Sequence, residues 1–331
     1  MLDITKIEKA YELMLEASQL LQNALEQPFF EGYIENIGNI IQNYQVRTLD
    51  GVPDKQTKAQ LKKLYQELQK LKLTFADWRK ISQLVLLKGT VLESIQANHQ
   101  LTPDSLGFLF SYLIEQLTGD QKDLVLLDNA VGMGNLMLTL LLNLSLSGKR
   151  VKGYGIDNDD TLLNIVAVNA ELTQVDLQLF LQDGLQNADI ESVDIVVSDL
   201  PVGYYPNDAY AQNFSVFAKE DHTYAHHLLA EKAMMYLKPG GFGLFLLPTN
   251  LLQTEQAALF EKWLRSEVYL QGVIGLPENL FKKKQIAKSI FILQKPGEQV
   301  KQQEVFATSL SSLTNVEEIK RFSLQFKTWM R

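Results

Sequence analysis

Four acidic residues that follow short apolar runs are the first candidates for chemistry in this chain of 331 residues. The runs LVLLD, GYGID, LQLFLQD and VDIVVSD end in Asp128, Asp157, Asp183 and Asp199. In an open parallel sheet, ligands bind outside the carboxyl ends of the strands. A single acid at such a place could be a helix N-cap. Four consecutive runs that end in an acid favour a shared ligand-binding edge.

The stretch LLDNAVGMGN places two glycines between a predicted strand and a predicted helix. Gly132 and Gly134 allow a tight turn and a close approach of the backbone to a ligand. The stretch differs from the dinucleotide fingerprint G-x-G-x-x-G, because Met137 stands in place of the third glycine. Asp128 also ends the strand where a pyrophosphate would lie. A carboxylate suits an ammonium group better than a phosphate, which disfavours NAD or FAD.

Two further acids indicate the remaining parts of the ligand. Asp157 stands 29 residues after Asp128, and an acid at this place in a Rossmann-like site accepts hydrogen bonds from ribose hydroxyls. Asp183 can accept a hydrogen bond from an exocyclic amino group. A ribose, an adenine and an ammonium-bearing tail together describe S-adenosylmethionine (SAM).

The elements that must position these acids alternate between strands and helices. Apolar runs continue at GFGLFLLP, LQGVIGLP and SIFILQK, and most runs are separated by helical segments at about 134–147, 160–172, 223–237 and 254–267. This alternation predicts βαβ units and a mainly parallel sheet with helices on both faces. Before the first strand, LTPDSLGFLF predicts a helix with Thr102 as its N-cap and Pro103 at its first position.

The first hundred residues are predicted to be helical. Apolar residues recur at helical spacing in ITKIEKAYELMLEASQLLQNALEQ and in KQTKAQLKKLYQELQKLKL. Thr74 and Asp77 predict a capping box for a further helix that extends to about Ile95. We therefore predict a helical domain over residues 1–97 and a second domain over residues 98–331. The lysine-rich face of the second segment is expected to be solvated, with a polyanion as the alternative contact.

Composition limits the classes of function. A net charge of −8 argues against nucleic-acid binding over the whole surface, although a local basic patch remains open. The absence of cysteine excludes disulfides, thiol catalysis and cysteine-ligated metals. No apolar run of about twenty residues and no secretory signal are visible. We expect a cytoplasmic protein that is not bound to a membrane. Three histidines of one loop and helix are not expected to bind a metal: His222, His226 and His227.

The order of DNAVGMG, GID, QDG and SDLPVGYYP resembles class I SAM-dependent methyltransferases of the N6-adenine type. It is most similar to the modification subunits of type I restriction systems and to stand-alone YtxK-like relatives. The resemblance covers about residues 98–296. It implies a Rossmann-like α/β fold with a seven-stranded, mostly parallel sheet whose last strand is antiparallel, preceded here by an all-helical domain. The cofactor that it implies is SAM.

The resemblance also assigns residues to the cofactor site. The Thr-Pro segment before the first strand helps to close the SAM pocket in this family, and the remaining contacts come from the loops after the strands. The implied cofactor-binding residues are Thr102, Pro103, Asp128, Ala130, Gly132, Gly134, Asp157, Asn158, Asp183, Gly184 and Asp199. No metal is implied.

The stretch VSDLPVGYYP matches the family's acceptor motif, (Asn/Asp)-Pro-Pro-(Tyr/Phe), in part. In the family, the acid or amide and a backbone carbonyl accept the two N–H bonds of the target amine, and an aromatic ring stacks on the base. Here the motif reads Asp199-Leu200-Pro201-Val202. The resemblance implies catalytic roles for Asp199, for the Leu200 carbonyl and for Pro201. Because Val202 replaces the aromatic residue, Tyr204 or Tyr205 must supply the stacking ring from a shifted turn.

Three functions therefore stay open: methyl transfer to an exocyclic amine such as adenine N6, methyl transfer to another acceptor, and a SAM-binding regulatory role without catalysis. Asp199 and Pro201 favour the first function, and Val202 favours the last. Nucleic acid is a possible partner, and so is a protein that binds the helical domain. The aromatic residues of the loop after Pro201 are expected either to stack on a base or to anchor the loop. The basic stretch FKKKQIAKS, from Lys282 to Lys288, is either a solvated hairpin or a contact for substrate phosphate.

Overall fold

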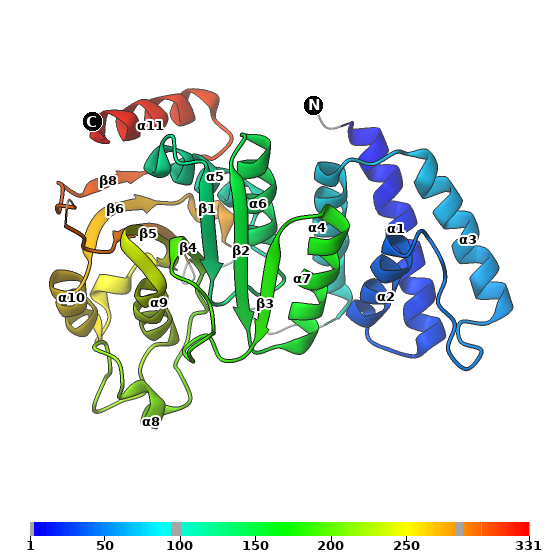
Figure 1. Ribbon diagram of the computed structural model, residues 1–331, viewed down its shortest axis with the longest axis horizontal. Coiled ribbons are helices and arrows are strands. Elements are labelled where there is room, and N and C mark those ends of the chain that lie inside the picture. Colours follow the sequence, from blue (N-terminus) through cyan, green and yellow to red (C-terminus); the bar gives the residue numbers. More distant parts are fainter. Residues whose placement is uncertain (1–2, 94–100, 282–286, 299, 331) are drawn as a thin grey trace.

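The computed structural model describes residues 3–93, 101–281, 287–298 and 300–330 (Figure 1). A group of helices from the N-terminal part lies at one end, and a mixed sheet covered by helices forms the remainder (Figure 1). The predicted boundary between residues 97 and 98 lies outside the described residues. No helix within the described ranges is long and apolar enough to cross a membrane.

Between residues 3 and 93, the structure has four helices: α1 (Ile4–Leu25), α2 (Phe29–Ile41), α3 (Lys55–Lys70) and α4 (Phe75–Leu92). Their apolar faces form a shared core that includes Met14, Tyr33 and Leu61. The predicted capping box is confirmed, because Thr74 Oγ1 accepts from the Asp77 N–H at 3.2 Å and Asp77 Oδ2 accepts from the Thr74 N–H at 2.9 Å. The helix that it starts ends at Leu92.

The C-terminal part contains all of the predicted strands and helices. Its helices are α5 (Asp104–Thr118), α6 (Asn135–Leu146), α7 (Asp160–Thr173), α8 (Asp208–Ala211), α9 (Ala225–Tyr236), α10 (Ala257–Ser266) and α11 (Val316–Trp329), with short 3₁₀ turns at Leu251–Gln253 and Glu278–Leu280. Its strands are β1 (Asp123–Asp128), β2 (Arg150–Asp157), β3 (Leu177–Leu181), β4 (Val193–Asp199), β5 (Leu237–Pro248), β6 (Tyr269–Gly275), β7 (Lys288–Gln294) and β8 (Phe306–Ser309).

The strands form one sheet in the order β3-β2-β1-β4-β5-β7-β6-β8. Strand β7 is antiparallel to both of its neighbours, and the other pairs are parallel. The Rossmann-like methyltransferase fold is thereby confirmed. The sheet has an eighth strand beyond the seven predicted, because the four-residue β8 adds to the edge at β6. The chain runs outward from β1 through β2 to β3 and then returns to β4, so the switch in strand order lies between β1 and β4.

Helices cover both faces of the sheet, as predicted. Helices α5, α6 and α11 contribute Phe110, Met137 and Phe326 to the core on one face. Helices α9 and α10 contribute Leu228 and Trp263 to the core on the other face. The helical layers thus leave the carboxyl ends of the parallel strands accessible for a ligand.

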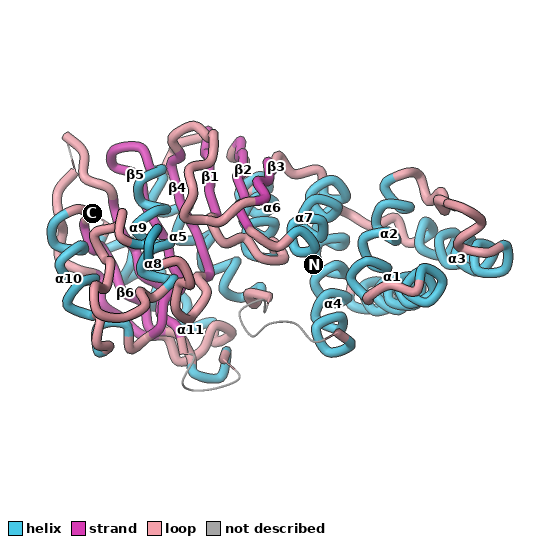
Figure 2. The backbone as a smooth tube through the Cα atoms, turned by 90° about the horizontal axis from the view of Figure 1, so that it is seen from below, coloured by secondary structure: helices cyan, strands magenta, loops and turns pink. Residues whose placement is uncertain are grey.

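Helix α7 links the two parts of the molecule, and in two perpendicular views it lies between the strands and the N-terminal helices (Figures 1 and 2). Val166 packs toward the sheet. Leu162 and Ile165 belong to the core of the N-terminal helices. The hydroxyl of Tyr33 on α2 donates a hydrogen bond to Asn169 Oδ1 at 2.7 Å, and both side chains are buried. The helical domain is therefore docked directly on the sheet domain.

Candidate cofactor and acceptor site

The four predicted acids lie at one edge of the sheet. Asp128, Asp157 and Asp199 are the last residues of β1, β2 and β4, and Asp183 lies two residues beyond β3. A cavity of about 340 Å³ opens along this edge and falls in the size range of small-molecule sites. It is lined by Asn129, Ala130, Gly132, Asp157, Asn158, Asp183, Gly184, Leu185, Asp199, Pro201, Val202, Gly203, Tyr204, Tyr205, Pro206, Ala225 and Leu229.

A second, smaller hollow of about 30 Å³ adjoins this cavity. Ala130, Gly132 and Asp199 line both spaces. Thr102, Asp128 and Gly134 line the smaller hollow alone. The structure therefore gathers the predicted site residues around one pair of hollows, with two exceptions: Pro103 and Leu200 line neither of them.

The glycine loop between β1 and α6 has the backbone shape that the sequence predicts. Gly132 has φ +54° and Gly134 has φ +76°, the left-handed region that favours glycine. A Cβ on Gly134 would lie 2.8 Å from Val166 Cγ1, so this glycine lets the loop pack on α7. A Cβ on Gly132 would meet nothing within 4 Å and would project into open space that a ligand could fill. Gly134 is needed for packing, whereas Gly132 leaves room beside the backbone.

The carboxylates on the cofactor side are held by nearby backbone N–H groups. Asp157 Oδ1 accepts from Asp159 N at 3.1 Å, and its Oδ2 accepts from Gly132 N at 2.8 Å. Asp183 Oδ1 accepts from Leu185 N at 2.9 Å, and its Oδ2 accepts from the hydroxyl of Tyr205 at 2.7 Å. These hydrogen bonds fix both acids while their side chains still border the cavity. Burial and the neighbouring Asp183 carboxylate raise the pKa of Tyr205.

Asp128 is the most buried of the four acids, with 2% of its surface exposed. Its Oδ1 accepts hydrogen bonds from Ser198 Oγ at 2.7 Å and from Ala130 N at 3.0 Å. Burial raises the pKa of Asp128 to about 7, and the charges of Asp199 and Asp157 add to this effect. A cation placed beside Asp128 would favour its ionised form. The site thus suits a ligand with a positive charge and a hydroxyl-bearing sugar.

On the acceptor side, two oxygens converge on one nitrogen. Lys288 Nζ donates to Asp199 Oδ1 at 2.5 Å and to the carbonyl oxygen of Leu200 at 2.7 Å. The Leu200 side chain is fully buried in the core, so this residue offers only its backbone to the site. Asp199 Oδ2 accepts from the hydroxyl of Thr102 at 2.8 Å. Lys288 is the functional neighbour that the sequence did not assign to Asp199. Of the basic stretch, Lys282 to Lys284 lie outside the described residues.

The predicted N-cap role of Thr102 is wrong. Helix α5 begins at Asp104, Pro103 is the residue before it, and no side chain caps it. The Thr102 hydroxyl bonds Asp199 instead, and its carbonyl accepts from Asn135 Nδ2 at 2.6 Å. A tertiary partner, Asp199, has displaced the local cap.

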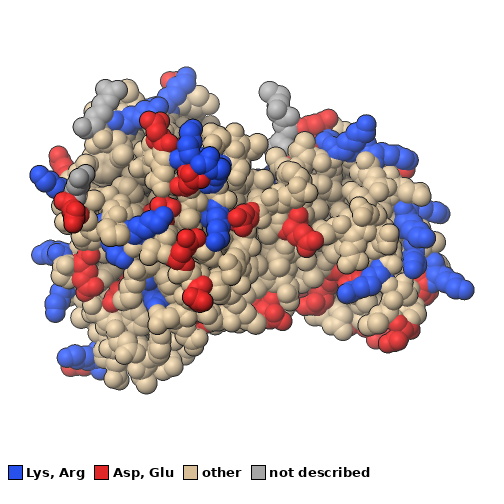
Figure 3. Space-filling model, viewed as in Figure 1, with Lys and Arg blue, Asp and Glu red and all other residues tan. Residues whose placement is uncertain are grey.

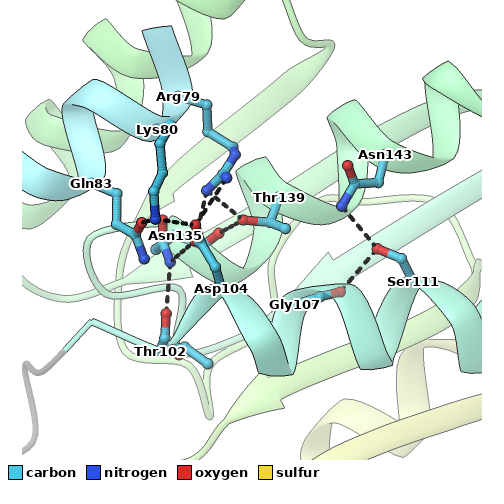
Figure 4. A network of polar contacts seen from close by, with 10 residues as sticks. All are labelled: Arg79, Lys80, Gln83, Thr102, Asp104, Gly107, Ser111, Asn135, Thr139 and Asn143. Atoms are coloured by element: carbon cyan, nitrogen blue, oxygen red, sulfur yellow. Dashed lines mark hydrogen bonds and ion pairs between the residues drawn. The ribbon is translucent and has the colours of Figure 1, made fainter. Parts of the chain in front are cut away.

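A polar network ties this segment to the helical domain (Figure 4). Arg79 on α4 pairs with Asp104 at 2.8 and 3.1 Å and also donates to Thr139 Oγ1 at 3.1 Å. Lys80 adds a second ion pair to Asp104 at 3.0 Å. Asn135, at the start of α6, donates to Asp104 at 3.3 Å as well as to Thr102. The helical domain thus holds one wall of the site in place.

Most aromatic side chains of the loop after Pro201 anchor it. Tyr205 and Tyr210 donate hydrogen bonds to Asp183 and to the Leu185 carbonyl, and Phe214 is buried. Tyr204 differs, because half of its surface is exposed and its ring stacks on Tyr224 with centroids 4.9 Å apart. Tyr204 and Tyr205 both line the cavity, and of the two rings that of Tyr204 is the more exposed.

Two of the three histidines near this loop belong to the protein interior, whereas the exposed His222 lies with its Nδ1 2.8 Å from Asp208 Oδ2. His226 and His227 are buried on α9, and burial lowers their pKa values to about 4 and about 2, so both are neutral. His227 packs 4.6 Å from the ring of Phe260. In the part of the chain that the structure describes, no group of three or more ligand-type side chains is arranged for a metal ion.

The mixed sheet with acids at its switch point defines a protein of the SAM-dependent methyltransferase class. A family model described as N-6 DNA Methylase matches residues 95–329, and one described as the YtxK N-terminal helical domain matches residues 8–90. The chain belongs to the N-6 DNA methylase family. This confirms the resemblance drawn from the sequence.

Relatives match over nearly the whole length. The uncharacterized protein YtxK of Bacillus subtilis (strain 168) is 36% identical over 324 residues, which span 97% of this chain and 96% of YtxK. A Listeria monocytogenes structure described as a candidate class I SAM-dependent methyltransferase is 36% identical, with a TM-score of 0.90 over 99% of this chain and 100% of that one. The methyltransferase subunit of a type I restriction-modification system from Streptococcus thermophilus shares the fold at 18% identity and a TM-score of 0.66, over 95% and 74% of the two chains.

Proposed function

We propose that the protein transfers the methyl group of SAM to an exocyclic amino group, with adenine N6 of nucleic acid as the acceptor. The observation that carries this proposal is the convergence of Asp199 Oδ1 and the Leu200 carbonyl on a single nitrogen. Two oxygens so placed can accept both N–H bonds of one amine. Family membership supports the reaction, and the acceptor is our inference.

The cofactor side is assigned as follows. Asp157 and Asn158 accept and donate hydrogen bonds at the ribose, Asp183 accepts from the adenine amino group, and Asp128 pairs with the ammonium group. Gly132 leaves room for the ligand beside its backbone. When bound, SAM supplies a methyl group attached to a positively charged sulfur, and this sulfur is a good leaving group. The carboxylates of this side hold the ligand and take no part in bond making.

The acceptor side must orient a weak nucleophile. The lone pair of an exocyclic amine is conjugated into the ring, so both of its N–H bonds have to be held for the lone pair to point at the methyl group. Asp199 and the Leu200 carbonyl hold them. An N–C bond forms, the S–C bond breaks with its electron pair on sulfur, and one proton leaves the nitrogen for solvent. Tyr204 stacks on the base that carries the amine.

Nucleic acid and protein remain proposed partners. Basic side chains gather at the outer end of the helical domain, where α3 carries the exposed Lys62, Lys63 and Lys70 (Figure 3). We propose this end as a contact for a polyanion or for a partner protein. We also propose a cytoplasmic location, because the proposed acceptor, nucleic acid, lies inside the cell.

A SAM-binding role without catalysis is the second candidate. Val202 supports it, because Val202 lines the cavity where the family carries an aromatic ring. The occupied position between Asp199 and Leu200 supports it as well.

Transfer of a radioactive methyl group from SAM tests the proposal. Single-stranded DNA with adenine is compared with the same sequence in which every adenine is replaced, and RNA and total protein serve as further acceptors. We expect label on the adenine-containing strands alone and a rate of labelling about a hundredfold or more lower with Asp199→Ala. Equal label on the adenine-free strand would contradict the adenine assignment. No transfer to any acceptor, with intact SAM binding by calorimetry, would favour the second candidate.

A further inference from the structure

Lys288 is the described side chain that fills the position assigned to the acceptor amine. It is the first residue of β7, and 12% of its side chain is exposed. Its ammonium group donates one hydrogen bond to Asp199 Oδ1 at 2.5 Å and another to the Leu200 carbonyl at 2.7 Å. These are the two bonds that the proposed reaction requires from its substrate.

The sheet itself brings Lys288 to this place. Because β7 is antiparallel to β5, it starts at the edge where the parallel strands end, and Lys288 pairs with Pro248, the last residue of β5. Strand β5 is the neighbour of β4, which ends at Asp199. The Thr249 N–H donates to the Ala287 carbonyl at 2.8 Å and continues the pairing beyond the strand. The lysine side chain thus spans the end of β5 and reaches β4.

The ammonium nitrogen of Lys288 and the nitrogen of a substrate amine differ in the strength of the hydrogen bonds that they donate and in their reactivity. A hydrogen bond from a charged donor is stronger than one from a neutral donor such as an exocyclic amine. A lysine ammonium therefore competes well for Asp199. It carries no lone pair, so the bound ammonium is not itself a methyl acceptor. Lys288 holds the position without reacting.

We propose that Lys288 is an internal competitor for the acceptor site, so that a substrate amine binds between Asp199 and the Leu200 carbonyl only after Lys288 has moved out. This inference rests on the proposed function, since it concerns the same two oxygens. A nucleic-acid substrate offers phosphate groups as new partners for the displaced ammonium. Substrates that carry phosphate close to the target amine are thereby favoured over small neutral amines.

The first experiment needs no acceptor activity and no variant. The wild-type protein is treated with a limiting amount of an acetylating reagent, and the labelling rate of each lysine is followed by peptide mass spectrometry. We expect Lys288 to be labelled about tenfold more slowly than the exposed Lys320, and Asp199→Ala to remove this protection. Adenine-containing single-stranded DNA should speed the labelling of Lys288 in the wild type. Labelling of Lys288 at the rate of Lys320 would overturn the proposal and leave the proposed function untouched.

The second experiment measures competition. Lys288→Met removes the charge and keeps the length of the side chain, and Lys288→Gln serves as a second variant. We expect the KM for an adenine-containing oligonucleotide to fall about tenfold, with SAM binding by calorimetry unchanged. Lys295→Met is the matched control, because Lys295, which follows the other end of β7, also donates two hydrogen bonds, to the backbone carbonyls of Met235 and Leu237. That variant should leave the KM unchanged.

The outcomes separate the two proposals. A protected Lys288 together with an unchanged KM in both variants would make the lysine a structural residue and would overturn the competition. A failure of the wild type and both Lys288 variants to methylate or bind any adenine-containing acceptor, while SAM still binds, would overturn the proposed acceptor. Competition for that acceptor would then be rejected too, whatever the labelling of Lys288 shows.

Discussion

The two halves of the site are held in different ways. On the cofactor side, Asp128, Asp157 and Asp183 each accept a hydrogen bond from the backbone N–H two residues further along the chain. On the acceptor side, Asp199 is held by the side chains of Thr102 and Lys288, which lie 97 and 89 residues away in the sequence. Each acid of the cofactor half therefore has a local backbone partner besides its remote ones, whereas the side-chain partners of Asp199 both come from remote segments. A single substitution can alter the acceptor half while the cofactor half stays intact.

The largest expected effect is a loss of methyl transfer when the acceptor half alone is changed. Asp199→Ala should lower kcat for methyl transfer by about a hundredfold to a thousandfold, since it removes one of the two acceptors that orient the amine. The Kd for SAM should stay within about twofold. Steady-state kinetics and calorimetry measure the two quantities. A parallel loss of SAM binding would show that the halves are not separable.

The next effect lies on the cofactor side. Asp157→Ala should weaken SAM binding by about a hundredfold, because the ribose loses a charged hydrogen-bond acceptor and the loop loses its bond to Gly132 N. Asp160→Ala is the matched control, since Asp160 is an exposed acid at the start of α7, three residues further on. Calorimetry should find the control unchanged. Undiminished binding by Asp157→Ala would refute the assignment of this residue.

A smaller effect is expected from the stacking ring. Tyr204→Ala should raise the KM for an adenine-containing oligonucleotide about tenfold, as expected for the loss of one stacked base. Tyr204→Phe keeps the ring and should behave like the wild type. A defect of the same size in Tyr204→Phe would mean that the hydroxyl, and not stacking, matters.

The smallest effect concerns pH. Because burial raises the pKa of Asp128 to about 7 and a cationic ligand pairs with its ionised form, SAM affinity should fall about fivefold between pH 7 and pH 6. Without ligand, the free energy of unfolding has the opposite pH dependence to the SAM affinity. The native chain keeps a proton that the unfolded chain loses above pH 3.8, so the free energy of unfolding should fall as pH rises from about 4 to 7. Calorimetry and thermal unfolding at several pH values measure both trends, and Asp128→Asn should abolish them.

The same contrast explains what could be predicted from the sequence. Asp128, Gly132 and Gly134 form a local pattern, and the structure places them as expected at the end of β1 and in the loop before α6. The contact between Lys288 and Asp199 has no local signal, because it arises only once β7 is inserted beside β5. Thr102 carried a misleading signal, since its hydroxyl bonds the remote Asp199 and does not cap α5.

The position of α7 has a consequence for the unit of folding. Its outer surface carries Leu162, Ile165 and Leu172, which are buried by the N-terminal helices. A sheet domain produced alone would turn these side chains toward water, at a cost of about 1.5–3 kcal/mol for each. Val166 of the same helix rests against the cofactor loop at Gly134. Although the predicted domain boundary follows residue 97, we expect the two segments to fold and unfold together as one cooperative unit.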